Sequence, residues 1–94
     1  MSRARPKAIE ALRKAKVGDF DAADLLMKES HEAVEAAHKF QTSLLQGDMD
    51  EDNPDQVEVS LLMVHGQDHL MNALTVQDLV TELIDMLRQQ VAKI

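Results

Sequence analysis

The short stretch from residue 64 to residue 69 combines the side chains of this sequence that could do chemistry. It reads Val-His-Gly-Gln-Asp-His, so His65 and His69 are four positions apart and Asp68 lies between them. Residues three and four positions apart share one face of a helix, which brings Asn72 to the same face. Apolar residues surround these polar ones, and a polar group in an apolar stripe is costly unless it is paired. We therefore weigh a structural, a metal-binding and a reactive role.

The two histidines have the spacing of a metal site on a single helix. A zinc protease would need Glu directly after the first histidine, and Gly66 stands there instead. Asp68 is a candidate third ligand, but the spacing indicates no further ligand cluster. We interpret His31 as a surface residue and His38 as a structural residue at the edge of an apolar stripe. A helical metalloenzyme is one alternative, and tight stoichiometric zinc binding would support it.

A reactive role is favoured for His65 more than for the other histidines. It is followed by Gly66, and glycine inside a helix costs roughly 0.5–1 kcal/mol relative to alanine. The glycine removes bulk beside the imidazole and lets another surface approach closely. A neutral imidazole is a nucleophile, and Gln67 or Asp68 could orient a group attached to it. The residues alone leave open a reactive His65 and a structural His65 at an interface.

An acidic segment precedes this stretch and resembles part of a calcium-binding loop. Asp48, Asp50 and Asp52 match the first three liganding positions. The sixth position should be Gly and is Asn53, and the twelfth should be Glu and is Val59. A solvated charged loop is the better interpretation.

Hydrophobic periodicity predicts three helices. Pro6 suits the first turn of the first helix, Gly18 is expected to end it in a left-handed conformation, and Asp19 is expected to cap the second helix. Gly47 is expected to stop the second helix. The predicted helices span residues 6–17, 20–46 and 54–92, after a frayed arm at 1–5.

The third helix is expected to begin with Asn53 as its cap and Pro54 at its first position. It holds the longest apolar run, residues 57–91. Its stripe comprises Leu61, Leu62, His65, His69, Asn72, Val76, Leu79, Leu83 and Met86. Three helices joined by a tight turn and a loop predict an all-α protein, an up-down-up antiparallel bundle forming a single domain over 1–94.

Composition excludes several classes of protein. The net charge of −7 and the lack of a basic-aromatic pattern exclude a nucleic-acid binder. No apolar stretch reaches membrane-spanning length and no signal peptide is recognisable, so we expect a cytoplasmic protein. A chain of 94 residues without Cys has a modest core and no disulfide, so association with further copies is the expected source of added stability.

Three stretches resemble one known family. Residues 63–71 (Met-Val-His-Gly-Gln-Asp-His-Leu-Met) are similar to the signature of the lactose/N,N′-diacetylchitobiose (cellobiose) class of enzyme IIA proteins, components of the bacterial phosphoenolpyruvate-dependent sugar phosphotransferase system. Residues 8–20 resemble the end of the family's first helix and the turn after it. Residues 35–42 resemble the middle of its second helix. The resemblance covers nearly the whole chain.

The resemblance implies a specific function. The family forms three-helix protomers that assemble into a nine-helix homotrimer. The phosphocarrier protein HPr would phosphorylate His65, with Nε2 as the implied atom, and a cysteine of the cognate enzyme IIB would then receive the phosphoryl group for sugar import through the membrane component IIC. Asp68 would lie at the trimer axis, where three copies bind one Mg²⁺. His69 and Gln67 could hold the phosphoryl oxygens.

Two further functions remain as alternatives to that of a phosphotransferase-system component. A histidine phosphotransfer domain of two-component signalling is also a helical bundle with one reactive histidine, but it typically has Lys three residues later, where this chain has Asp68. A non-enzymatic association module would use His65 and Asp68 only to fix the register of its helices.

Overall fold

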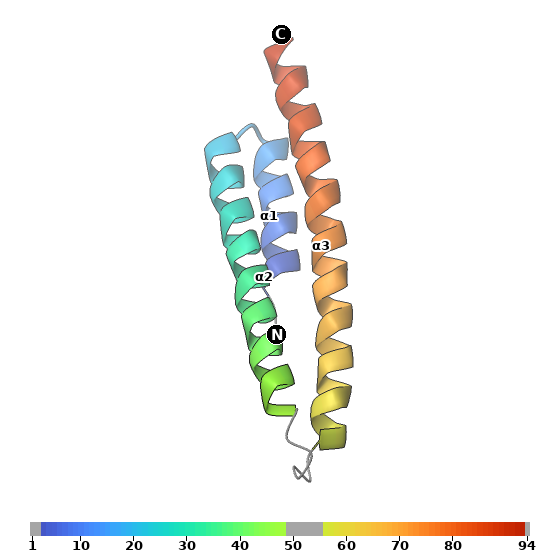
Figure 1. The fold of residues 1–94 in the computed structure, drawn as a ribbon. Coiled ribbons are helices and arrows are strands. Elements are labelled where there is room, and N and C mark those ends of the chain that lie inside the picture. Colours follow the sequence, from blue (N-terminus) through green and yellow to red (C-terminus); the bar gives the residue numbers. More distant parts are fainter. Residues whose placement is uncertain (1–2, 49–55, 94) are drawn as a thin grey trace.

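Three helices make up the computed structural model, which describes residues 3–48 and 56–93. They are α1 (Ala4–Lys16), α2 (Phe20–Asp48) and α3 (Gln56–Ala92), and they run up, down and up (Figure 1). This confirms the expected all-α antiparallel bundle. Helix α2 continues past Gly47, which was expected to stop it. The expected Asn53 cap and Pro54, with Asp50 and Asp52 of the calcium comparison, lie outside the described residues.

The turn between α1 and α2 forms as its residue types predict. Gly18 has a φ of +84°, the left-handed region that glycine adopts without steric cost. Its N–H donates to the carbonyl of Ala15 over 3.0 Å, and the N–H of Asp19 donates to the carbonyl of Lys14 over 2.9 Å. These two bonds complete a Schellman motif. The Asp19 carboxylate then accepts the N–H of Ala22 at 3.2 Å, which caps α2.

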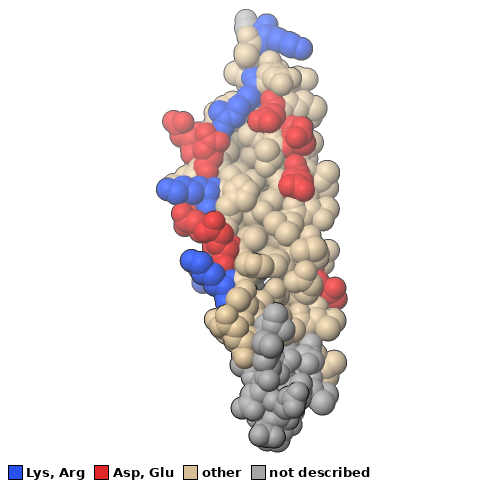
Figure 2. Space-filling view, viewed as in Figure 1, with Lys and Arg blue, Asp and Glu red and all other residues tan. Residues whose placement is uncertain are grey.

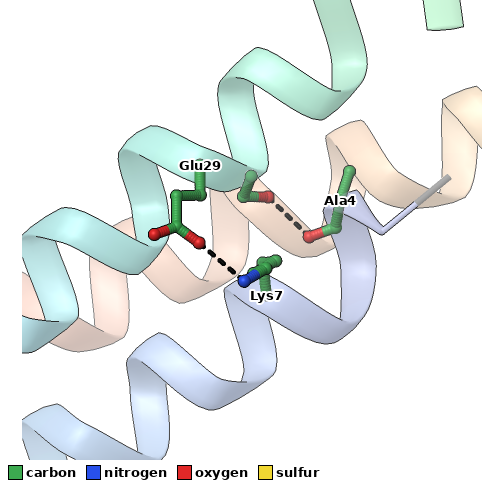
Figure 3. A network of polar contacts seen from close by, with 4 residues as sticks. Ala4, Lys7 and Glu29 are labelled. Carbon is green, nitrogen blue, oxygen red and sulfur yellow. Dashed lines mark hydrogen bonds and ion pairs between the residues drawn. The ribbon is translucent and has the colours of Figure 1, made fainter. Parts of the chain in front are cut away.

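Helix α1 begins earlier than its sequence indicates. Ala4 is its first residue and is fully buried, so the expected frayed arm at 1–5 is wrong from residue 4 onward. The reason is a tertiary contact: the hydroxyl of Ser30, on α2, donates to the carbonyl of Ala4 over 2.5 Å (Figure 3). Pro6 still lies in the first turn, where a missing N–H does no harm.

The core is narrow where α1 meets the other two helices. Every buried residue of α1 is an alanine, so the helix backbones can approach closely. Ile9 and Leu12 of α1 are only partly buried and pack against the edge of this core. The buried core cluster is Ala8, Ala11, Ala15, Ala23, Met27, Val80 and Ile84.

A buried polar chain joins all three helices. The side-chain amide of Gln77 on α3 donates to the hydroxyl oxygen of Ser30 over 2.8 Å, and that hydroxyl donates onward to Ala4. Ser30 is fully buried and Gln77 is 2% exposed. Buried polar groups are tolerated when they are hydrogen-bonded. These two hydrogen bonds therefore fix the positions of the three helices along the bundle axis.

Charged contacts lie on the surface of the bundle. Lys7 on α1 pairs with Glu29 on α2 at 2.6 Å (Figure 3), and Arg88 on α3 pairs with Asp24 while lying 4.9 Å from the centre of the Phe20 ring. Acidic and basic side chains alternate along the edge formed by α2, and much of the surface beside that edge is uncharged (Figure 2). Each exposed ion pair contributes little to stability.

Helix α3 carries apolar side chains on two faces. One face packs against α1 and α2 through Leu70, Ala73, Gln77, Val80 and Ile84. The opposite face, here called the outer stripe, exposes Leu61, Val64, Met71, Leu79, Leu83 and Met86, by 39% to 66% of their surface. Much of the stripe expected from spacing belongs to this outer stripe and not to the core. None of the three helices, over the residues described, is both long and apolar enough to cross a membrane.

Candidate functional site

His65 and His69 lie side by side on α3, as their spacing predicts. Their Nε2 atoms are 3.1 Å apart, and the two rings meet edge to face, with centroids at 4.6 Å and planes at 84°. At this distance one ring donates its Nε2–H to the Nε2 of the other. Both side chains are exposed, so this pair is open to a second molecule.

Gly66 lets α2 come close beside this pair. A Cβ at residue 66 would lie 2.8 Å from the side-chain nitrogen of Gln41, closer than real Cβ contacts. Gln41 is only 8% exposed, so its amide is packed against α3 at the turn that carries His65. The prediction that this glycine allows a close approach is confirmed, and the approaching group is Gln41.

Sequence reasoning missed Gln41. The residue lies four positions after Ala37 and seven after Val34, which are both half-buried, so it continues the inward face of α2. That spacing was a usable signal. It was overlooked because an amide at such a position reads as a break in an apolar stripe.

Asp68 is exposed and lies within the outer stripe. Each residue of a helix is rotated by about 100° from the one before it, so Asp68 lies within about 20° of Leu61 and Met86 around the helix axis. An isolated carboxylate is thus placed in the middle of a solvent-facing apolar surface. His65 lies about 60° away, on one flank of that stripe.

Gln67 is exposed but is not brought to the His65 ring. Residues two positions apart on a helix do not face each other, and these two project about 160° apart. Within one chain, the histidine pair is therefore supported by residues 66 and 41 and not by residue 67.

The described part of one chain forms no larger metal cluster. Within residues 3–48 and 56–93, no three His, Cys, Asp or Glu side chains come close enough to hold an ion together. His31 and His38 are exposed on α2. If built from the described residues, a metal site needing three carboxylates would have to draw them from several copies.

The fold and the site thus define a helical-bundle protein with an accessible imidazole pair on a partly apolar face. Residues 2–88 match the family model described as "PTS system, Lactose/Cellobiose specific IIA subunit". The chain belongs to this family of enzyme IIA subunits of sugar phosphotransferase systems.

Individual relatives agree with this family. The chain is 46% identical over 83 residues to the N,N′-diacetylchitobiose-specific EIIA component of Escherichia coli (strain K12), an alignment covering 88% of this chain and 69% of that one. It is 42% identical over 86 residues to the lactose-specific EIIA component of Staphylococcus epidermidis, covering 92% and 80%. The crystal structure of the cellobiose-specific enzyme IIA from Bacillus anthracis superposes with a TM-score of 0.79 at 44% identity, covering 97% and 81%.

These comparisons confirm the expected family and the helical-bundle fold. They also establish the coarse function, because the chain is a component of a sugar phosphotransferase system.

Proposed function

We propose that this chain is a phosphocarrier in which His65 accepts a phosphoryl group from phosphorylated HPr and donates it to a cysteine of its cognate IIB. The membrane component IIC would then import the sugar, so this carrier would work in the cytoplasm. The observation that carries the proposal is the accessible His65 ring, paired through Nε2 with His69 in a member of this family.

Phosphoryl transfer through His65 needs little covalent machinery. The lone pair of its Nε2 attacks phosphorus, and the bond from phosphorus to the histidine nitrogen of HPr breaks as the new one forms. In the second step the IIB thiolate attacks, a phosphorus–sulfur bond forms, and His65 leaves. Positioning therefore matters most, and the packing of Gly66 against Gln41 fixes the backbone that carries the ring.

His69 is proposed to support the carrier state. Its Nε2 lies 3.1 Å from the His65 Nε2 that would be phosphorylated, so its N–H can turn from that nitrogen to a phosphoryl oxygen. A hydrogen bond to a charged oxygen is stronger than one to a neutral nitrogen. This exchange would stabilise phosphorylated His65 relative to the unmodified pair.

We further propose that three copies assemble into a nine-helix homotrimer through the outer stripe. Large exposed apolar surfaces on small proteins are typical of interaction sites. Three copies of Asp68 would then meet at the axis and repel one another in surroundings of low polarity. Carboxylate oxygens are ligands that suit a hard divalent cation, so Mg²⁺ held by the three copies of Asp68 would offset this repulsion.

The experiment is to incubate the chain with phosphoenolpyruvate, enzyme I and HPr and to map the acid-labile phosphate by mass spectrometry. We expect phosphate on His65 in the unaltered chain and in the control His38→Gln, and none in His65→Gln. Label on another residue, or no label at all in a trimeric preparation, would overturn the proposal and favour a purely structural association module.

A further inference from the structure

The histidine pair has a geometry that suits more than phosphoryl transfer. We propose that His65 and His69 also form a two-histidine chelate for a transition-metal ion, and that Zn²⁺ is the ion bound in the cell. A bound ion would prevent the phosphorylation of His65. The chelate itself goes beyond the proposed function. The withholding of His65 rests on that function, so the two are tested separately.

The distance between the two nitrogens fits one shared ion. Zinc binds histidine nitrogen at about 2.0–2.1 Å, so two Nε2 atoms 3.1 Å apart subtend roughly 100° at the metal. This angle is close to the tetrahedral value that zinc prefers, and the ion would replace the proton now shared by the two rings. Each ring would turn so that its Nε2 lone pair points at the ion instead of at the other ring.

The chelate would lie on a turn of α3 that packs against α2. His65 and His69 lie on successive turns of α3, and the turn that carries them is packed against α2 where Gln41 meets Gly66. Both rings are exposed, so an ion can enter from solvent. Ligands fixed beforehand lose less freedom on binding, which raises affinity.

The remaining coordination positions are left to water. No third His, Cys, Asp or Glu joins the pair within the described parts of the chain. Imidazole nitrogen favours Cu²⁺, Ni²⁺ and Zn²⁺, whereas Mg²⁺ prefers oxygen ligands. The histidine pair and the carboxylate of Asp68 therefore belong to different classes of metal site, although Asp68 precedes His69 directly in the sequence.

Metal and phosphoryl group compete for one lone pair. The Nε2 lone pair of His65 either coordinates the ion or bonds to phosphorus, and it cannot do both. Zinc should therefore slow phosphorylation, and phosphorylation should by the same coupling weaken zinc binding.

Calorimetric titration of the metal-free chain with ZnCl₂, NiCl₂ and MgCl₂ tests the chelate. We expect uptake of about one Zn²⁺ per chain, unaffected by excess Mg²⁺. His69→Gln removes one of the two donors and should bind zinc at least roughly tenfold more weakly. His38→Gln removes an exposed histidine of α2 and should bind as the unaltered chain does. Equal zinc affinity in His69→Gln and the unaltered chain would overturn the chelate.

The withholding of His65 is tested by adding zinc to the phosphorylation reaction. The unaltered chain should be phosphorylated more slowly with zinc and recover with a chelator, whereas His69→Gln, supplied with the same enzyme I and HPr, should be affected much less. If zinc inhibits the unaltered chain and His69→Gln equally, zinc acts on enzyme I or HPr. That result would overturn the proposal that zinc withholds His65. If His65 takes up no phosphate even without metal, the proposed function fails, while calorimetry still decides the chelate.

Discussion

Gly66 sets how closely α2 and α3 approach beside His65. The Gln41 side-chain nitrogen lies 2.8 Å from the place a Cβ would occupy, and Gln41 is almost fully buried. The clash involves the far end of a flexible side chain, so a single methyl group can be accommodated by moving it. A branched side chain needs more room, and Gln41 is too buried to move far enough aside. The glycine thus controls local packing next to His65.

Gly66→Val should therefore destabilise the bundle. Overpacking a confined position costs about 1–3 kcal/mol, measured as the free energy of unfolding in urea at a fixed chain concentration. Gly66→Ala should cost less or even stabilise, because alanine in a helix gains about 1 kcal/mol over glycine.

The matched control for Gly66→Val is the double variant with Gln41→Ala. Shortening residue 41 makes room for the added side chain, so the two changes should be non-additive by more than about 0.5 kcal/mol. Additive effects would mean that Gln41 does not fill the space beside residue 66.

The sequence was most informative about the site at the level of single residues. The spacing of His65 and His69 predicted a shared face, and the glycine predicted a close approach. The partner in that approach, Gln41, could not be chosen because it comes from another helix. Gln67 is only two positions from His65 in the sequence, yet it projects from a different side of the helix.

At the scale of helices, the chain of hydrogen bonds from Gln77 through Ser30 to Ala4 aligns all three elements. The Ser30 hydroxyl has one defined orientation, because it accepts a hydrogen bond from the Gln77 amide and donates one to the Ala4 carbonyl. Removing Ser30 alone would leave the Gln77 amide buried beside an apolar methyl group. An unsatisfied buried donor carries a desolvation penalty.

Ser30→Ala should lower the free energy of unfolding by about 1–3 kcal/mol and speed amide hydrogen exchange at the start of α1. Ser30→Ala combined with Gln77→Leu should cost less than the sum of the two single changes, since neither polar group is then stranded. If amide hydrogen exchange at the start of α1 is unchanged in Ser30→Ala, the hydrogen bonds through Ser30 do not anchor α1.

The element boundaries show which physical information the sequence lacked. Gly18 and Asp19 fix their turn locally, so that boundary was predictable. The start of α1 depends on Ser30, which is 26 residues away from Ala4, and no local pattern reports it. The apolar residues of α3 serve two opposite faces, so spacings of three and four could not distinguish the core face from the outer stripe.

At the scale of the whole molecule, the single chain is a thin rod, 64 × 17 × 14 Å in extent. A bundle this narrow buries one face of α3 and leaves the outer stripe in solvent. The sequence predicted the family and the bundle, which the comparisons confirm. It could not show the proposed assembly, in which the contacts that cover the outer stripe would lie between chains.

Asp68→Leu should leave the proposed homotrimer intact, make it more stable and reduce any dependence of its stability on Mg²⁺. Replacing like charges at a buried axis with apolar surface is often stabilising. The control is Asp85→Leu, an exposed residue of α3 that lies about 100° from Asp68 around the helix, and it should have no such effect. Leu79→Glu, which puts a charge into the outer stripe, should produce monomers. Sedimentation measures both, and an Asp68→Leu chain that sediments as a monomer would remove Asp68 from the axis.

The most direct test of the central claim follows one labelled phosphoryl group through the relay. Phosphorylated chain, purified away from HPr and enzyme I, is mixed with its cognate IIB, and the label is located at intervals on both proteins. If His65 is the carrier, label leaves it as label appears on a cysteine of IIB, and His65→Gln never carries label. Label that remains on this chain in the presence of folded IIB, or that reaches IIB equally well through His65→Gln, would contradict that claim.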